Sequence, residues 1–100
     1  MRDMPPVHPG EILREEFLKP LGLSVYAVAK AIRVPQTRLH EIVHQTRGVT
    51  ADTALRLGRY LRTGPEIWMN LQAHYDLVCA QEAHGAKIEA EVQPSDLVAA

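Results

Sequence analysis

The chain is 100 residues long, 46% of its residues are hydrophobic, and its formal net charge is −1. This length is enough for one domain with a single core, but not for the two lobes that flank a typical protease cleft. Only five residues are aromatic, and no run alternates Val, Ile or Thr with polar residues, which argues against a sheet. Apolar residues recur instead at spacings of three and four, so we expect an all-α fold.

The sequence also indicates a cytoplasmic protein. Its one cysteine, Cys79, cannot form a disulfide within the chain. The first residues, MRDMPPVHPGEIL, lack the apolar segment of a signal peptide, and no apolar run reaches membrane-spanning length. We therefore expect no association with a membrane.

The charges are segregated along the chain. Residues 29–63 contain seven basic and two acidic side chains, a net charge of +5, whereas residues 64–100 contain one basic and six acidic side chains, a net charge of −5. Residues 1–28 have a net charge of −1. A basic middle segment is typical of a protein that binds a polyanion.

The first part of the chain predicts two short helices. A helix from Gly10 to Lys19 is expected, with Pro20 and Gly22 ending it. Ser24 can cap the second helix through its side-chain oxygen. The apolar side chains of that helix recur at i, i+3, i+4 and i+7 and are expected to face the core: Val25, Val28, Ala29 and Ile32.

A third helix follows after a tight turn. Only Arg33 and Val34 precede Pro35, whose missing N–H suits the first turn of a helix. The residues of this helix predicted to face the core are Leu39, Ile42 and Val43. The opposite side is a polar strip, rich in side chains that read base edges, formed by Gln36, Thr37, His40, Glu41 and His44.

Two further helices complete the predicted domain. Thr50 can cap the fourth, and Thr63 and Glu66 have the capping-box spacing at the start of a fifth, which we expect to end at about Glu82. The apolar stripe on the fifth helix can belong either to the core or to a dimer interface; it consists of Trp68, Leu71 and Tyr75. Residues 1–82 are therefore the predicted domain, and residues 83–100 are expected to form a mobile or partner-ordered tail.

Two short helices and a tight turn over about residues 24–44 are the pattern of a helix-turn-helix, whose second helix enters the major groove of DNA. Here the sequence resembles a known family. The segments HPGEIL, LSVYAVAKAIRVPQTRLHEIV, RGVTADTALRLGRYL and PEIWMNLQAHYDL are similar to the HigA-type antitoxins of bacterial toxin–antitoxin modules, a branch of the lambda-repressor-like (Xre) class. The similarity extends from about Pro6 to Leu77.

The resemblance implies a five-helix repressor domain that forms a homodimer, binds an operator upstream of its own operon, and neutralises a HigB or RelE-like toxin that cleaves messenger RNA. By position, the start of the recognition helix and its next turn are formed by Gln36, Thr37, Arg38, His40 and Glu41. The loop and helix N-terminus that approach phosphates in such repressors correspond to Arg47, Thr50 and Asp52. The sequence departs from the family pattern at three places: HQTRG replaces an Asn-Gly-Lys-type turn, Gly58 stands where alanine is common, and Arg62 stands where glycine is common.

The chemistry of these side chains predicts their roles. Gln pairs bidentately with adenine and Arg with guanine, so Gln36, Thr37 and Arg38 are expected to read bases, although the same residues would suit an ordinary solvated face. Arg47 is expected to contact phosphate, and the further candidates for that role are Lys30, Arg56, Arg59 and Arg62. Which of the three residues at the start of the helix touches a base is left open.

One motif points to different chemistry. HEIVH, residues 40–44, matches H-E-x-x-H, in which two histidines hold zinc and the glutamate is the general base. The extended metzincin pattern requires glycine and histidine where this chain has Arg47 and Thr50. We therefore expect no enzyme activity, metal or cofactor. The alternatives are a free-standing Xre-type transcriptional regulator, a protein-interaction adaptor and, remotely, a zinc hydrolase.

Overall fold

The computed structural model describes residues 5–98, and within this range the chain forms helices and no strand. The first helical segment runs without a break through α1 (Pro9–Ile12), the π-helical stretch η1 (Leu13–Leu18) and α2 (Lys19–Leu21). The other helices are α3 (Val25–Ile32), α4 (Gln36–Val43), α5 (Ala51–Tyr60) and α6 (Glu66–Glu91). Because α1 and α2 are the two ends of one helix, the predicted all-α, five-helix fold is confirmed.

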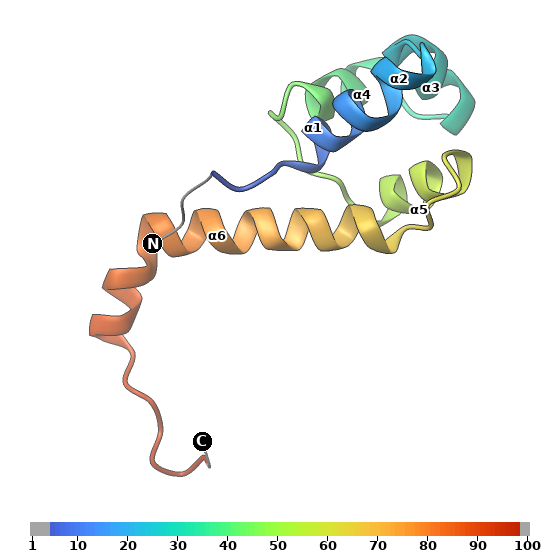
Figure 1. Cartoon of the computed structure of the whole chain (residues 1–100). Helices are drawn as coiled ribbons and strands as arrows, with labels where there is room; N and C mark the ends of the chain where they lie inside the picture. Colours follow the sequence, from blue (N-terminus) through green and yellow to red (C-terminus); the bar gives the residue numbers. More distant parts are fainter. Residues whose placement is uncertain (1–4, 99–100) are drawn as a thin grey trace.

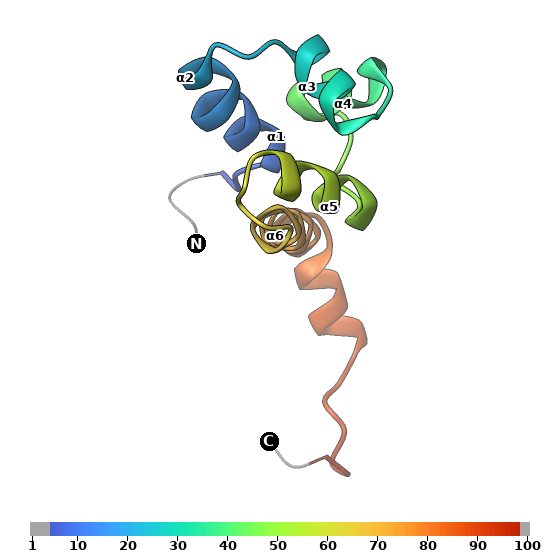
Figure 2. The same ribbon diagram turned by 90° about the vertical axis from the view of Figure 1, so that its right-hand side faces the viewer.

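The first helix and α5 pack on the first half of α6. This long helix runs along one side of the other helices, and its second half continues beyond them (Figure 1). Seen along its axis, α6 lies beneath α1 and α5 (Figure 2), and it contacts both. Apart from Gly85, every described residue from Ala80 to Val98 is exposed, so the far part of α6 is not supported by the core.

The core contains the apolar faces that the sequence spacing predicts. On α3 the buried residues are Val28, Ala29 and Ile32, and on α4 they are Leu39, Ile42 and Val43. Trp68 of α6 is fully buried, and its ring lies 5.6 Å from that of Phe17. Its indole N–H donates to the hydroxyl of Thr63 at 2.9 Å, so the one polar atom of this large side chain has a partner.

The first helix extends two residues beyond its predicted end at Lys19. Pro20 does not stop it, and the helix continues to Leu21 and ends at Gly22, the second predicted stop, which has a left-handed φ of 65°. Proline lacks an N–H and its ring collides with the carbonyl one turn back in a regular α-helix. The wider π-helical turns of η1, in which the N–H of Lys19 donates to the carbonyl of Arg14, precede Pro20 and accommodate it.

Two expectations for α6 are wrong. Thr63 does not form a capping box, because its hydroxyl donates to the carbonyl of Gly64 at 2.7 Å and accepts from the indole of Trp68, and Pro65 precedes the helix. The helix also ends at Glu91 instead of about Glu82. Ala and Glu make up most of the segment AHGAKIEAE and favour a helix without any apolar periodicity. The expected tail therefore begins as a helix, and residues 92–98 lie outside it.

His8 connects the first helix to α6. Its side chain is 2% exposed, and its Nδ1 accepts from the N–H of Gly10 at 2.9 Å, which caps α1. The ring packs edge-on against Tyr75 of α6, with 4.8 Å between the centroids. Gly10 is needed here because a Cβ would collide with the carbonyl oxygen of Ile42 on α4. The start of α1 is thus fixed between α4 and α6.

The stability of the fold should consequently fall in mild acid. Burial lowers the pKa of His8 from its ordinary value of 6.5, and the carboxylate of Asp76 opposes this shift only in part. As the pH falls below 6.5, the unfolded chain takes up the proton first, so the free energy of unfolding decreases until the pH passes the folded-state pKa.

Urea unfolding between about pH 7.5 and about pH 5.5 measures this effect. We expect His8→Asn, which retains a capping side chain, to lose this part of the pH dependence. His84→Asn, on the exposed part of α6, should retain it. Equal pH dependence in the wild type and in His8→Asn would contradict the interpretation.

Candidate nucleic-acid interface

The turn between α3 and α4 is closed by backbone hydrogen bonds. Ser24 caps α3 as predicted, because its Oγ accepts from the N–H of Ala27 at 3.0 Å. At the other end Arg33 is left-handed, with a φ of 63°, and the N–H of Val34 donates to the carbonyl of Ala29 at 3.0 Å. Pro35 then precedes α4. Two eight-residue helices joined in this way have the form of a helix-turn-helix.

The polar side of α4 is open to solvent. Gln36 and Thr37 are exposed, and Arg38, His40 and Glu41 are half-buried. The amide nitrogen of Gln36 lies 3.1 Å from Nε2 of His40, and since an amide nitrogen only donates, His40 accepts this hydrogen bond. Four of the five side chains predicted to form one strip therefore do lie on α4, opposite the buried Leu39, Ile42 and Val43, whereas the fifth, His44, is the exposed C-cap residue.

The loop after α4 folds back on that helix. The N–H of Thr46 donates to the carbonyl of Glu41 at 2.8 Å, and Nε of Arg47 donates to the carboxylate of Glu41 at 2.7 Å. Gln45 has a left-handed φ of 66°, which costs a residue other than glycine about 1 kcal/mol. Beyond the loop, Thr50 caps α5 by accepting from the N–H of Thr53. Arg47 and the N-terminus of α5 thus follow the end of α4 directly.

Two of the seven basic side chains of the middle segment are ion-paired, Arg47 with Glu41 and Arg56 with Asp52. Arg56 is a structural residue, because its guanidinium donates to Asp52 at 2.7 Å and to the carbonyl of Ile32, at the end of α3, at 3.0 Å. By contrast, five cations have no ion pair within the described part of the chain, and their charge is available to phosphates: Lys30, Arg33, Arg38, Arg59 and Arg62.

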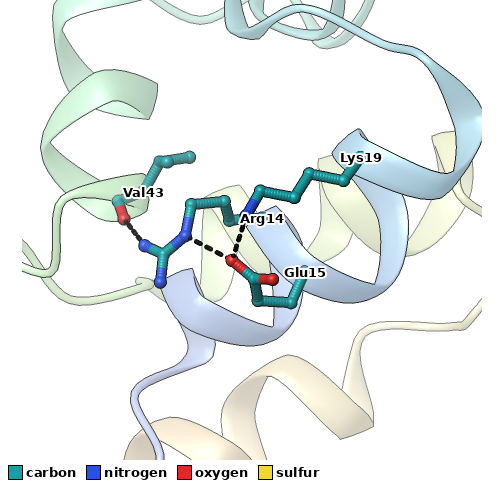
Figure 3. A network of polar contacts seen from close by, with 4 residues as sticks. All are labelled: Arg14, Glu15, Lys19 and Val43. Atoms are coloured by element: carbon teal, nitrogen blue, oxygen red, sulfur yellow. Dashed lines mark hydrogen bonds and ion pairs between the residues drawn. The ribbon is translucent and has the colours of Figure 1, made fainter.

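Arg14 secures the C-terminal end of α4. Its Nη1 donates to the carbonyl of Val43 at 2.8 Å, and its Nε donates to the carboxylate of Glu15 at 2.9 Å, which also accepts from Lys19 at 2.9 Å (Figure 3). The hydrogen bonds from Lys19 and from Arg14 lower the pKa of Glu15. A cation at a helix C-terminus both bonds a free carbonyl and opposes the helix dipole. The first helix therefore stabilises α4.

The apolar stripe predicted on the last helix lies mostly against the core. Trp68 is fully buried, Leu71 is partly buried against the core, and Tyr75 is half-buried against His8. Within the same part of α6, the buried Gln72 accepts from the N–H of Val49 at 2.7 Å. Sequence reasoning missed Gln72, although a polar residue one turn after Trp68 on an apolar face is a visible signal.

Known proteins share this arrangement. No protein-family model matches the sequence. The virulence-associated protein I of Dichelobacter nodosus is 56% identical over 80 residues, which cover 80% of this chain and 74% of the relative. The antitoxin HigA-1 of Vibrio cholerae is 38% identical over 73 residues, 72% of this chain and 68% of the relative. A solved structure of the Pseudomonas aeruginosa antitoxin HigA with the higBA promoter has a TM-score of 0.87 at 48% identity, and the match covers 89% of this chain and 97% of that one. The chain belongs to the HigA family of antitoxins.

HigA membership places the chain in the Xre-like helix-turn-helix class, among regulators that are not enzymes. In this HigA-type fold HEIVH covers the last turn of α4 and its C-cap residue, His44, and Glu41 is paired with Arg47. The rings of His40 and His44 stack with 6.1 Å between their centroids. Among residues 5–98, no three His, Cys, Asp or Glu side chains are grouped so as to hold a metal ion. In the same range, no helix combines the length and the apolar character needed to cross a bilayer.

Removing Arg14 should destabilise this HigA-type domain. We expect Arg14→Met to lower the free energy of unfolding by about 1–2 kcal/mol, because the carbonyl of Val43 loses its partner. Glu15→Gln removes only exposed ion pairs and is expected to have a small effect. Urea unfolding compares the two variants. If Arg14→Met were no more destabilising than Glu15→Gln, the hydrogen bond to α4 would have no role in stability.

Proposed function

We propose that this chain is an antitoxin and autorepressor that binds operator DNA as a dimer and neutralises an RNA-cleaving, RelE-like toxin. The observation that carries the proposal is the solvent-exposed polar side of α4, with Gln36, Thr37 and Arg38 in its first turn. The Pseudomonas relative whose structure contains a promoter supports the same use of the fold. Residues that begin a recognition helix are those that reach base edges in helix-turn-helix proteins.

The residues around α4 support a division between reading and positioning. Gln36 can form two hydrogen bonds with adenine, and Arg38 can do so with guanine. Arg47 and the N-terminus of α5 at Thr50 offer a cation and free N–H groups to phosphates, which fix register without reading sequence. Lys30, exposed on α3 and without an ion pair in the described chain, adds a further phosphate contact.

A dimer would double the number of base pairs that one short helix can read. A two-fold pair of recognition helices fits a palindromic site with half-sites one DNA turn apart. The side chain of Trp68 belongs to the core, so the apolar surface left for a second copy includes Leu55, 60% exposed, and Met69, 37% exposed. These two residues line a hollow of about 300 Å³ between α5 and α6.

The acidic end of the chain supports a basic protein partner. An RNA-cleaving toxin has to bind a polyanion, so its active surface is expected to be basic. Glu89 and Glu91 are exposed on the unsupported part of α6, and Asp96 is exposed beyond it. Complementary charge would speed association with such a toxin and orient it on α6. DNA would then bind the side of the molecule formed by α4, and the toxin would bind the far part of α6.

Two substitutions separate reading from positioning. Arg47→Ala should weaken binding to operator and to random DNA alike, because a phosphate contact is independent of sequence. Gln36→Ala should reduce the binding free energy by about 1–3 kcal/mol on the operator and leave binding to random DNA unchanged. Fluorescence anisotropy on both duplexes measures the effects, with Lys87→Ala on the far part of α6 as control. Equal losses on both duplexes from Gln36→Ala would mean that this face of α4 does not read bases.

The toxin partner can be tested with the adjacent reading frame. We expect a short basic protein encoded beside this gene to co-purify with the chain and to lose its RNA-cleaving activity in the complex. Replacing both Glu89 and Glu91 with Lys should weaken that complex and leave operator binding unchanged. An adjacent gene product that neither binds the chain nor cleaves RNA would instead favour a free-standing Xre-type regulator.

A further inference from the structure

We infer that Gln72 of α6 is a positioning residue for DNA binding, which fixes the loop containing Arg47 and Thr50 in the conformation that meets the phosphates. The inference rests on the proposed binding of DNA by this face. It assigns to α6, which lies away from the polar side of α4, an effect on affinity for DNA that acts through the loop. The link is one hydrogen-bonded contact across 23 residues of sequence.

Both polar atoms of the Gln72 side chain are engaged. The side chain is 9% exposed, its Oε1 accepts from the N–H of Val49 at 2.7 Å, and its Nε2 donates to the carboxylate of Asp76 at 2.9 Å. Asp76 therefore fixes which way the amide points and presents the oxygen to Val49. The contact is also tight, because a Cβ at Gly48 would lie 3.0 Å from three atoms of the Gln72 amide. A side chain at position 48 would therefore force the Gln72 amide to shift by a few tenths of an ångström.

Gln72 supplies an anchor that the rest of the loop lacks. The first half of the loop is bound to α4, through Thr46 and Arg47 to Glu41. In the second half the N–H of Val49 has Gln72 as its partner, immediately before Thr50 begins to cap α5. Without this hydrogen bond a buried donor loses its partner, and the segment from Arg47 to Thr50 gains conformational freedom. DNA would then have to order the segment, and the ordering cost reduces affinity.

The test uses an operator duplex selected by the wild-type full-length chain from a pool of randomised duplexes. Gln72→Leu removes both hydrogen bonds and keeps a side chain of similar size. Asp76→Asn is the matched control, because the asparagine oxygen can still accept from Gln72. The double variant combines Gln72→Glu with Asp76→Asn and keeps both contacts. The carboxylate at position 72 accepts from the N–H of Val49, and it also accepts from the amide at position 76, so the donor and the acceptor of the second contact are exchanged. Binding is measured well below the unfolding temperature of each variant.

We expect Gln72→Leu to weaken operator binding about tenfold and to reduce the slope of log affinity against log salt by about one. The operator affinity of Asp76→Asn and of the double variant should remain within about threefold of the wild-type affinity. The affinity of Gln72→Glu alone should fall outside that range. In the Gln72→Leu background, Arg47→Ala should reduce the free energy of operator binding by less than about half of its effect in the wild type. Arg38→Ala, on α4, should cost the same in both backgrounds.

Different outcomes separate the two levels of the argument. If the wild type selects no duplex, the proposed function fails. If it selects one and folded Gln72→Leu binds it with unchanged affinity and salt slope, the function stands and the role of Gln72 is overturned. If Gln72→Leu weakens binding but the costs of Arg47→Ala and Arg38→Ala are both unchanged, its effect is general, and the positioning role is again overturned. Rescue by the double variant supports the hydrogen-bonded contact itself.

Discussion

Helix α4 is only eight residues long, and a helix of that length is marginal in water unless other elements stabilise it. Its buried side secures it to the core, but its C-terminal carbonyls need partners of their own. Arg14 supplies one by donating to the carbonyl of Val43, and Gly10 lets the first helix approach the carbonyl of Ile42 closely. The equally short α3 is stabilised in the same way, because Arg56 donates to the carbonyl of Ile32 at its C-terminal end. The proposed DNA-binding surface therefore depends on arginines that lie on other helices.

Periodicity was enough to predict the helices and their buried sides. The spacing of Leu39, Ile42 and Val43 gave the orientation of α4, because a short amphipathic helix has only one side it can bury. Two of the three predicted helix caps are confirmed, because Ser24 and Thr50 do cap their helices. The third is wrong, because the hydroxyl of Thr63 accepts a hydrogen bond from the indole N–H of Trp68 instead. The far part of α6 was missed because helix-forming composition alone, without an apolar stripe, sustains it.

The candidate site was less predictable where its geometry depends on residues distant in sequence. The net charge of the middle segment identifies a basic region, but charge alone does not separate Arg56, which caps α3, from Lys30, which has no ion pair in the described chain. Arg14 and Gln72 meet their backbone partners across 29 and 23 residues, and no local pattern reports such contacts. HEIVH illustrates the opposite error, because helical spacing alone brings two histidines together on a helix whose glutamate pairs with Arg47.

The central claim is that α4 and the loop after it form the surface that meets DNA. Backbone amide chemical shifts, followed by NMR as an operator duplex is added, test it most directly. The account predicts that the largest changes lie at residues 36–41 and 47–52, with little change in the part of α6 beyond Ala80. Changes concentrated on that far part of α6, with the amides of α4 unaffected, would contradict the account.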